Sequence, residues 1–318
     1  MSMCLSLVVP FLNEKEALPI FYERACALAA DQPWTLQIIF VNDGSTDGSD
    51  VLARDLVLAD PRCLLVNFSR NFGKEPALFA GLSYAEGDVV VPIDVDLQDP
   101  IDLIPKMVAE WRNGAEVVLA RRTNRMSDST AKRWSAELFY VLHNLISDIK
   151  IEKNVGDYRL MDRKVVDAIL ELPERKLFMK GLLSWVGFRT VVLDYTREPR
   201  IAGSSKFNGW KLWNFALEGI TSFSTLPLRL WTYLGLGIAG ISLLYAFYMV
   251  VDKLVNGNPV PGYPSLMTAI LFLGGVQLIG LGVLGEYVGR IYEETKQRPK
   301  FVVSGTVRAE TDSADDAS

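Results

Sequence analysis

One stretch reads Val89-Val90-Val91-Pro92-Ile93-Asp94-Val95-Asp96-Leu97-Gln98-Asp99-Pro100, an apolar run that leads into acidic side chains, an amide and a proline. Side chains of an extended strand alternate between its faces, so Asp94 and Asp96 are expected on one side, with Gln98 if the strand continues. Two neighbouring carboxylates repel each other unless a cation lies between them. A hard divalent cation that also holds phosphate oxygens meets that need. The stretch therefore predicts a metal and diphosphate site, with a solvated acidic turn as the alternative.

Segments with strand character alternate with segments of helical character on both sides of this stretch. The expected strands are 5–10, 36–41, 63–68, 88–94 and 116–120. This order predicts an α/β fold with a mainly parallel, doubly wound sheet. Ligands of such sheets bind beyond the carboxyl ends of the strands. The polar residues expected at that edge are Asn13, Glu14, Asp43, Asp94 and Asp96.

The composition argues against some classes of protein. The chain has 318 residues and a formal net charge of -5, whereas nucleic-acid-binding proteins normally carry a basic face, so no nucleic-acid partner is expected. Mean hydropathy is +0.17, high for a purely soluble protein, and the apolar excess lies near the C-terminus. The three cysteines are widely spaced, which fits a reduced environment better than a disulfide framework.

Four motifs occur in order along the first hundred residues. They are Val-Val-Pro-Phe-Leu-Asn-Glu at 8–14, Val-Asn-Asp-Gly-Ser-Thr-Asp at 41–47, Arg-Asn-Phe-Gly-Lys at 70–74 and Asp-Val-Asp-Leu-Gln-Asp-Pro at 94–100. Together they resemble the motifs of family 2 glycosyltransferases, and more narrowly of those that load a sugar onto a polyprenyl phosphate. The resemblance implies a Rossmann-like, nucleotide-sugar-binding domain of the GT-A type.

Two later segments resemble loops of the same family. In the Gly-aromatic-Arg-Leu loop, the acidic residue at the position of Asp157 lies near the acceptor. Residues 197–207 match an Arg-x-x-Gly-x-Ser-Lys segment, in which Arg200, Ser205 and Lys206 are hydrogen-bond donors suited to phosphate oxygens. We expect this segment to close over the donor diphosphate; a basic loop that faces lipid headgroups is the alternative.

Residues 131–146 repeat aromatic and apolar side chains at helical intervals after a basic start. Such a helix suits a membrane surface, where Lys132 and Arg133 would collect an anionic lipid headgroup. A helix packed on the sheet, with both basic residues solvated, is an equal alternative. Arg121, which follows the fifth expected strand, is a further candidate for guiding the acceptor phosphate.

Two nearly uncharged stretches, 228–251 and 265–284, predict transmembrane helices, since about 20 apolar residues cross the bilayer. Glycines in the second stretch leave room for a homo-oligomer. More basic residues follow the second stretch than lie between the two, so both termini are expected in the cytoplasm. The predicted parts are a cytoplasmic glycosyltransferase domain (1–205), an interfacial amphipathic segment (206–226), a transmembrane hairpin (227–292) and a cytoplasmic tail (293–318) that is disordered from Ser304.

Segments 178–187, 206–213 and 285–290 narrow the resemblance to bactoprenol glucosyltransferases of the GtrB type, over residues 3 to about 302. The resemblance implies inverting transfer of glucose from UDP-glucose to undecaprenyl phosphate at the cytoplasmic face of the bacterial inner membrane. Mg²⁺ or Mn²⁺ is then held by Asp94 and Asp96, with help from Gln98. Uridine and the donor sugar are expected at Pro10, Asn13, Glu14, Asp43, Asp94, Ser205 and Lys206, and catalytic roles at Asp157, Asp96 and Arg200.

The sequence leaves the role of Asp157 and the identity of the sugar open. The acceptor is a phosphate monoester with a second pKa of about 6, so it is largely dianionic at neutral pH and needs little help from a base. Asp157 is therefore expected to orient a cation or the sugar rather than accept a proton. GDP-mannose or a UDP-aminoarabinose derivative are alternative donors. A membrane-anchored scaffold is the non-catalytic alternative, and a processive synthase is disfavoured because its Gln-x-x-Arg-Trp motif is missing.

Overall fold

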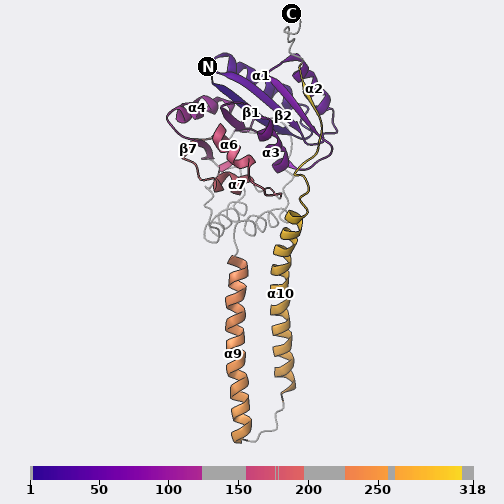
Figure 1. Ribbon diagram of the computed structural model, residues 1–318, viewed down its shortest axis with the longest axis vertical. Helices are drawn as coiled ribbons and strands as arrows, with labels where there is room; N and C mark the ends of the chain where they lie inside the picture. The colour runs from indigo at the N-terminus through magenta and orange to yellow at the C-terminus, as the bar shows by residue number, and fades with distance from the viewer. Residues whose placement is uncertain are drawn as a thin grey trace, which may run out of the picture.

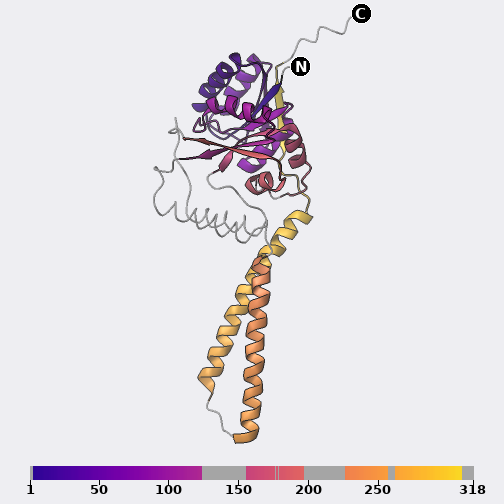
Figure 2. The same cartoon turned by 90° about the vertical axis from the view of Figure 1, so that its left-hand side faces the viewer.

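The structure, a computed structural model, describes residues 3–123, 155–175, 177, 179–196, 226–256 and 262–309. An α/β domain stands above two long helices that run side by side away from it (Figures 1 and 2). The strands are β1 Cys4–Phe11, β2 Thr35–Asn42, β3 Cys63–Phe68, β4 Val89–Pro92, β5 Val117–Arg122, β6 Val155–Asp162, β7 Thr190–Tyr195 and β8 Val303–Arg308. The helices are α1 Ala17–Ala30, α2 Ser49–Ala59, α3 Lys74–Tyr84, η1 Ile101–Leu103, α4 Ile104–Arg112, α6 Arg163–Leu170, α7 Met179–Trp185, α9 Leu226–Asn256 and α10 Tyr263–Thr295.

The described strands form one sheet in the order β7-β5-β6-β4-β1-β2-β3-β8. β1 pairs in parallel with β2 and β4, β2 with β3, and β5 with β7. β6 is antiparallel to both β4 and β5, and β8 is antiparallel to β3. The predicted mainly parallel sheet is therefore confirmed. Because β6 runs against its neighbours, its first residues lie at the edge where β1, β2, β4 and β5 end.

The sheet is covered on both faces, which explains the continuous apolar runs of its inner strands. On β1, Leu5, Leu7 and Val9 pack in one buried cluster, with α1, α2 and α4, while Val8 packs in a second, with α3, α6 and α7. A β-carbon added at Gly81 of α3 would lie 2.2 Å from a methyl carbon of Val8. A glycine at this position lets α3 pack directly against β1, and this packing sets the position of the helix on the sheet.

The strand β4 is shorter than predicted, which changes the backbone expected around Asp94, Asp96 and Gln98. β4 ends at Pro92, so Asp94 and Asp96 lie beyond the strand and Gln98 does not extend it. Leu97 has a φ of 55°, in the left-handed region, which turns the chain away from the strand direction. The premise of a strand continuing through these residues is wrong, although Asp94 and Asp96 still alternate with the buried Val95 and Leu97.

The prediction of disorder from Ser304 is wrong for residues 304–308, because β8 adds to the free edge of β3 (Figure 1). The segment before β8 also contacts the domain: Phe301 stacks on Phe68 with ring centroids 5.0 Å apart. Lys300 Nζ lies 3.6 Å from the centroid of the Phe79 ring in α3. These contacts tie the end of α10 to the α/β domain.

The two long helices correspond to the predicted membrane hairpin. In the described part of the chain, one helical segment is long and apolar enough to cross a membrane, Phe272–Thr295 of α10. The second predicted span, on α9, stays a prediction. α10 packs on α9 where Gly280 faces Trp231, since a β-carbon at Gly280 would lie 1.7 Å from the indole nitrogen. The predicted interfacial segment (206–226), except Leu226 at the start of α9, and the amphipathic segment at 131–146 lie outside the described residues.

Candidate active site

An acidic cluster with one lysine at its centre lies at the edge where β4 ends and β6 begins. Lys74 Nζ is 2.7 Å from Asp94 Oδ1 and 2.9 Å from Asp157 Oδ2. β4 and β6 pair with Val89 opposite Asp162 and Val90 opposite Met161. Asp94 lies two residues beyond the end of β4, and Asp157 is the third residue of β6. Two carboxylates that contact the same lysine would repel each other, and the ammonium group of Lys74 relieves that repulsion.

The two carboxylates also determine the protonation of Lys74. Desolvation lowers the pKa of Lys74, but the charges of Asp157 and Asp94 outweigh this effect and raise the pKa above its usual value. Lys74 therefore stays charged throughout the neutral range. The lysine closes the Arg-Asn-Phe-Gly-Lys motif, yet sequence reasoning assigned it no role.

Asp96 and Gln98 lie in the turn after Asp94. The backbone N–H of Gln98 donates to Asp96 Oδ1 at 3.2 Å, which holds the two residues together. The side-chain oxygen of Gln98 is buried and has no hydrogen-bond partner, an exception among buried polar atoms. An amide oxygen and two carboxylates are oxygen donors of the kind that Mg²⁺ and Mn²⁺ prefer. The residues predicted as metal ligands thus fit a divalent cation. Among the described residues no three or more His, Cys, Asp or Glu side chains form a group that could hold a metal ion, so a cation here would need the Gln98 oxygen besides the carboxylates of Asp94 and Asp96.

The residues predicted to hold uridine lie at the ends of β1 and β2, where they interlock two loops. Asn13, with a φ of 58°, donates its N–H to Ser45 Oγ at 3.0 Å and accepts the N–H of Thr46 at 2.8 Å. The N–H of Glu14 donates to Ser49 Oγ at 3.0 Å. These contacts give the loops a fixed shape beside Pro10. Binding of the nucleoside at these residues stays a prediction.

Asp43 anchors the loop that leads to Lys74. Its carboxylate accepts the N–H of Phe72 at 2.7 Å and the N–H of Gly73 at 3.0 Å. Burial raises the pKa of Asp43, and these two hydrogen bonds oppose that rise. Gly73 has a φ of 103°, which a residue with a side chain rarely adopts. Asp43 therefore positions the start of α3, whatever it contributes to nucleotide binding.

Two adjacent arginines, Arg121 and Arg122, end β5. Arg121, which was predicted to guide the acceptor phosphate, is paired with an acidic residue of β7. Arg121 forms a bidentate ion pair with Asp194 of β7, with nitrogen–oxygen distances of 2.7 and 3.0 Å. Arg122 contacts other residues: its Nε donates to Tyr195 Oη at 3.0 Å, and a terminal nitrogen lies 3.7 Å from Asp99. Desolvation lowers the pKa of Arg122, but the nearby charges, first Asp99 and more weakly Asp94, raise it overall.

A second basic residue that sequence reasoning missed is Arg159, two residues after Asp157 on β6. Its side chain is 3% exposed, and one terminal nitrogen donates to the carbonyl oxygen of Gly156 at 2.9 Å. Burial lowers the pKa of Arg159 to about 10, while Asp157 opposes that shift. Arg159 therefore remains charged at neutral pH and adds a buried positive charge behind Asp157.

The remaining predicted site residues lie outside the described part of the chain. They are Lys132, Arg133, Arg200, Ser205 and Lys206. The predicted lid and the predicted acceptor helix therefore stay predictions.

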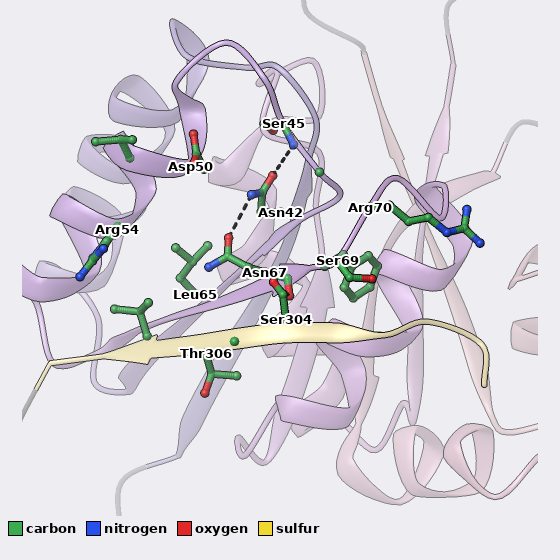
Figure 3. A pocket seen from close by; sticks show the side chains of 15 residues that line it. Asn42, Ser45, Asp50, Arg54, Leu65, Asn67, Ser69, Arg70, Ser304 and Thr306 are labelled. Atoms are coloured by element: carbon green, nitrogen blue, oxygen red, sulfur yellow. Dashed lines mark hydrogen bonds between the residues drawn. The ribbon is translucent and has the colours of Figure 1, made fainter.

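A separate cavity of about 570 Å³ lies between α2, the end of β3 and the edge strand β8 (Figure 3). On its wall, Asn42 donates to Asn67 at 3.0 Å and accepts the N–H of Ser45 at 2.9 Å (Figure 3). Arg54 and Arg70 also line it. None of Asp94, Asp96 and Asp157 lines this cavity, so it is distinct from the acidic cluster.

The chain matches known proteins over most of its length. Residues 6–170 match glycosyl transferase family 2, and residues 226–291 match the GtrB C-terminal hairpin. A bactoprenol glucosyl transferase of Shigella phage SfV is 60% identical, over 95% of this chain and 98% of the relative. A prophage bactoprenol glucosyl transferase homolog of Escherichia coli K12 is 56% identical, over 95% and 98%.

Among solved structures, the chain resembles a glucosyl-3-phosphoglycerate synthase from Mycobacterium tuberculosis. The TM-score is 0.50 at 19% identity, over 69% of this chain and 78% of that one. At this identity the likeness concerns the fold, and it agrees with a GT-A-like α/β domain. The chain therefore belongs to glycosyl transferase family 2, among its polyprenyl-phosphate glycosyltransferases.

Proposed function

We propose that the protein transfers glucose from UDP-glucose to undecaprenyl phosphate, with inversion at the anomeric carbon, at the cytoplasmic face of a bacterial inner membrane. The observation that carries the proposal is that Lys74 joins Asp94 to Asp157 at the edge of the sheet, with Asp96 and the unpaired side-chain oxygen of Gln98 in the turn after Asp94. Relatives with 60% identity are named bactoprenol glucosyl transferases, which supports the acceptor and the sugar. The mycobacterial structural neighbour was crystallised with Mn²⁺ and UDP-glucose, which supports the donor class and the metal.

Each part of the site then has a role that its chemistry suits. Asp94, Asp96 and Gln98 hold the divalent cation, and a bound cation neutralises the charge that grows on the UDP leaving group. The loops fixed by Asn13, Glu14 and Asp43 receive the nucleoside. Arg122 and Arg159 place positive charge at the edge that the acceptor phosphate must approach. Asp157 orients Lys74 and the reacting groups, and the dianionic acceptor attacks without a protein base.

We also propose that α9 and α10 both cross the membrane and present the site to the lipid-linked acceptor. The support is that large apolar side chains are exposed on both helices, where Leu244, Phe247, Leu278 and Leu281 are each more than 60% exposed. Large exposed apolar surfaces of this kind mark membrane or protein contacts. Single cysteines introduced at residues 257–261, between α9 and α10 in the chain, should react with an impermeant thiol reagent only from outside the cell. Labelling from the cytoplasmic side alone would contradict the two-span arrangement.

The proposed reaction is tested by incubating full-length protein in detergent with undecaprenyl phosphate and radiolabelled sugar nucleotide. Label should pass from UDP-glucose into the lipid fraction, and EDTA should stop the transfer. Preferential transfer from GDP-mannose or another UDP-sugar would show that the proposed donor sugar is wrong and that the proposed class of reaction is right. No lipid labelling from any sugar nucleotide would favour a scaffold and contradict the proposal.

A further inference from the structure

Lys74 contacts both carboxylates that face each other at the ends of β4 and β6. Its ammonium nitrogen is 2.7 Å from one oxygen of Asp94, 3.0 Å from the other, and 2.9 Å from Asp157. One of these two partners, Asp94, is also a ligand in the proposed metal site. The same carboxylate thus faces two cations, one belonging to the chain and one supplied by solvent.

The backbone around Lys74 is anchored on both sides, which fixes the position of the ammonium group. Before it, Asp43 accepts the N–H groups of Phe72 and Gly73. After it, Glu75 accepts the N–H of Met179 at 2.6 Å. Behind it, Gly81 holds α3 against β1. Lys74 therefore starts a helix that is docked on the sheet, and its side chain reaches the carboxylates from a defined origin.

We propose that Lys74 is an internal counterion that competes with the divalent cation for Asp94, so that metal binding requires the Lys74–Asp94 contact to open. This inference rests on the proposed metal site. A positive charge within 3 Å of a ligand carboxylate weakens the attraction of that carboxylate for a second cation. Lys74 keeps Asp157 as a partner when Asp94 turns to the metal. The lysine is thus a positioning residue that holds the two acids together in the empty site and lowers its affinity for free metal.

The test is a titration of the full-length protein in detergent with Mn²⁺ alone. Binding is measured as the decrease in the electron paramagnetic resonance signal of free Mn²⁺. Lys74→Met should bind Mn²⁺ about tenfold more tightly than the wild type, because the competing charge is gone. Lys74→Arg, which keeps the charge, should stay close to wild type. Lys106→Met, which removes an exposed lysine of α4, is the matched control and should not change the affinity. A purely structural role for Lys74 would not make metal binding tighter.

Unchanged or weaker Mn²⁺ binding by Lys74→Met, in protein that melts cooperatively, would overturn the inference. If Lys74→Met does not fold, Asp157→Asn tests the same competition: the ammonium group then pairs with Asp94 alone, and Mn²⁺ binding should weaken severalfold. Unchanged binding by that variant would overturn the inference too. Asp94→Asn distinguishes failure of the proposed metal site from failure of the inference about Lys74. Mn²⁺ binding that is insensitive to this change, or absent from every variant, would contradict the proposed metal site itself.

Discussion

Replacing Asp96 by asparagine is expected to lower the rate of sugar transfer about a thousandfold. A bound divalent cation contributes several kcal/mol of transition-state stabilisation, and about 4 kcal/mol corresponds to a thousandfold change in rate. Asparagine keeps an oxygen that can accept the N–H of Gln98, so the turn after β4 is retained while the charge is lost. The measurement is transfer of labelled glucose to undecaprenyl phosphate over a range of Mg²⁺ and Mn²⁺ concentrations.

Asp96 is a cleaner target than Asp94 for this experiment. Asp94 also pairs with Lys74, so its replacement changes both the metal site and the lysine contact. Asp55→Asn, at an exposed position of α2, removes the same charge elsewhere and should leave activity unchanged. Activity of Asp96→Asn within a few-fold of wild type, with undiminished response to EDTA, would show that Asp96 is not a ligand.

Replacing Asp157 by asparagine is expected to lower turnover about a hundredfold without a new dependence on pH between 6 and 8. The loss of one Lys74 partner misplaces groups around the reacting atoms, and a displacement of about 1 Å can reduce a rate a hundredfold. The acceptor has a second pKa of about 6 and carries its own negative charge, so no proton has to be removed by the protein. Turnover measured from pH 6 to 8 checks both parts of this expectation.

The matched control is Asp167→Asn on α6, which begins where β6 ends, at the opposite edge of the sheet. This change breaks an ion pair between the exposed Asp167 and the half-buried Arg163, remote from the acidic cluster, and should leave turnover unchanged. A steep new rise of the Asp157→Asn rate with pH, absent from the wild type, would identify Asp157 as the general base.

The sequence predicted the sheet well where burial on both faces leaves continuous apolar runs. Strands 5–10, 36–41 and 63–68 were placed to within about a residue or two of β1, β2 and β3. β6, β7 and β8 were missed, and β6 and β8 are held by pairing with distant strands rather than by their own composition. β6 carries Asp157 and Arg159, and β8 carries Ser304 and Gly305, so neither has a continuous apolar run. Nor does composition reveal the left-handed Leu97 that ends the extended chain after β4.

The sequence predicted the site residues that lie together in one motif. It missed the contacts that form only when distant segments pack together in the fold. Asp94 and Asp96 lie in one motif, whereas Lys74 lies 20 residues before Asp94 and meets it only through the packing of α3 on the sheet. The choice between Arg121 and Arg122 depends on the face of β5, because neighbouring residues of a strand point in opposite directions. The sequence analysis named only Arg121, and the contacts with Asp194 and Asp99 distinguish it from Arg122.

The central claim is that a divalent cation at Asp94 and Asp96 brings a nucleotide diphosphate to the edge of the sheet. The most direct measurement is an anomalous difference map from crystals of the protein grown with Mn²⁺ and UDP. We expect the manganese peak beside Asp94 and Asp96, near the side-chain oxygen of Gln98, with diphosphate oxygens on its other side. A manganese peak remote from residues 94–98, or UDP bound away from it, would contradict the account.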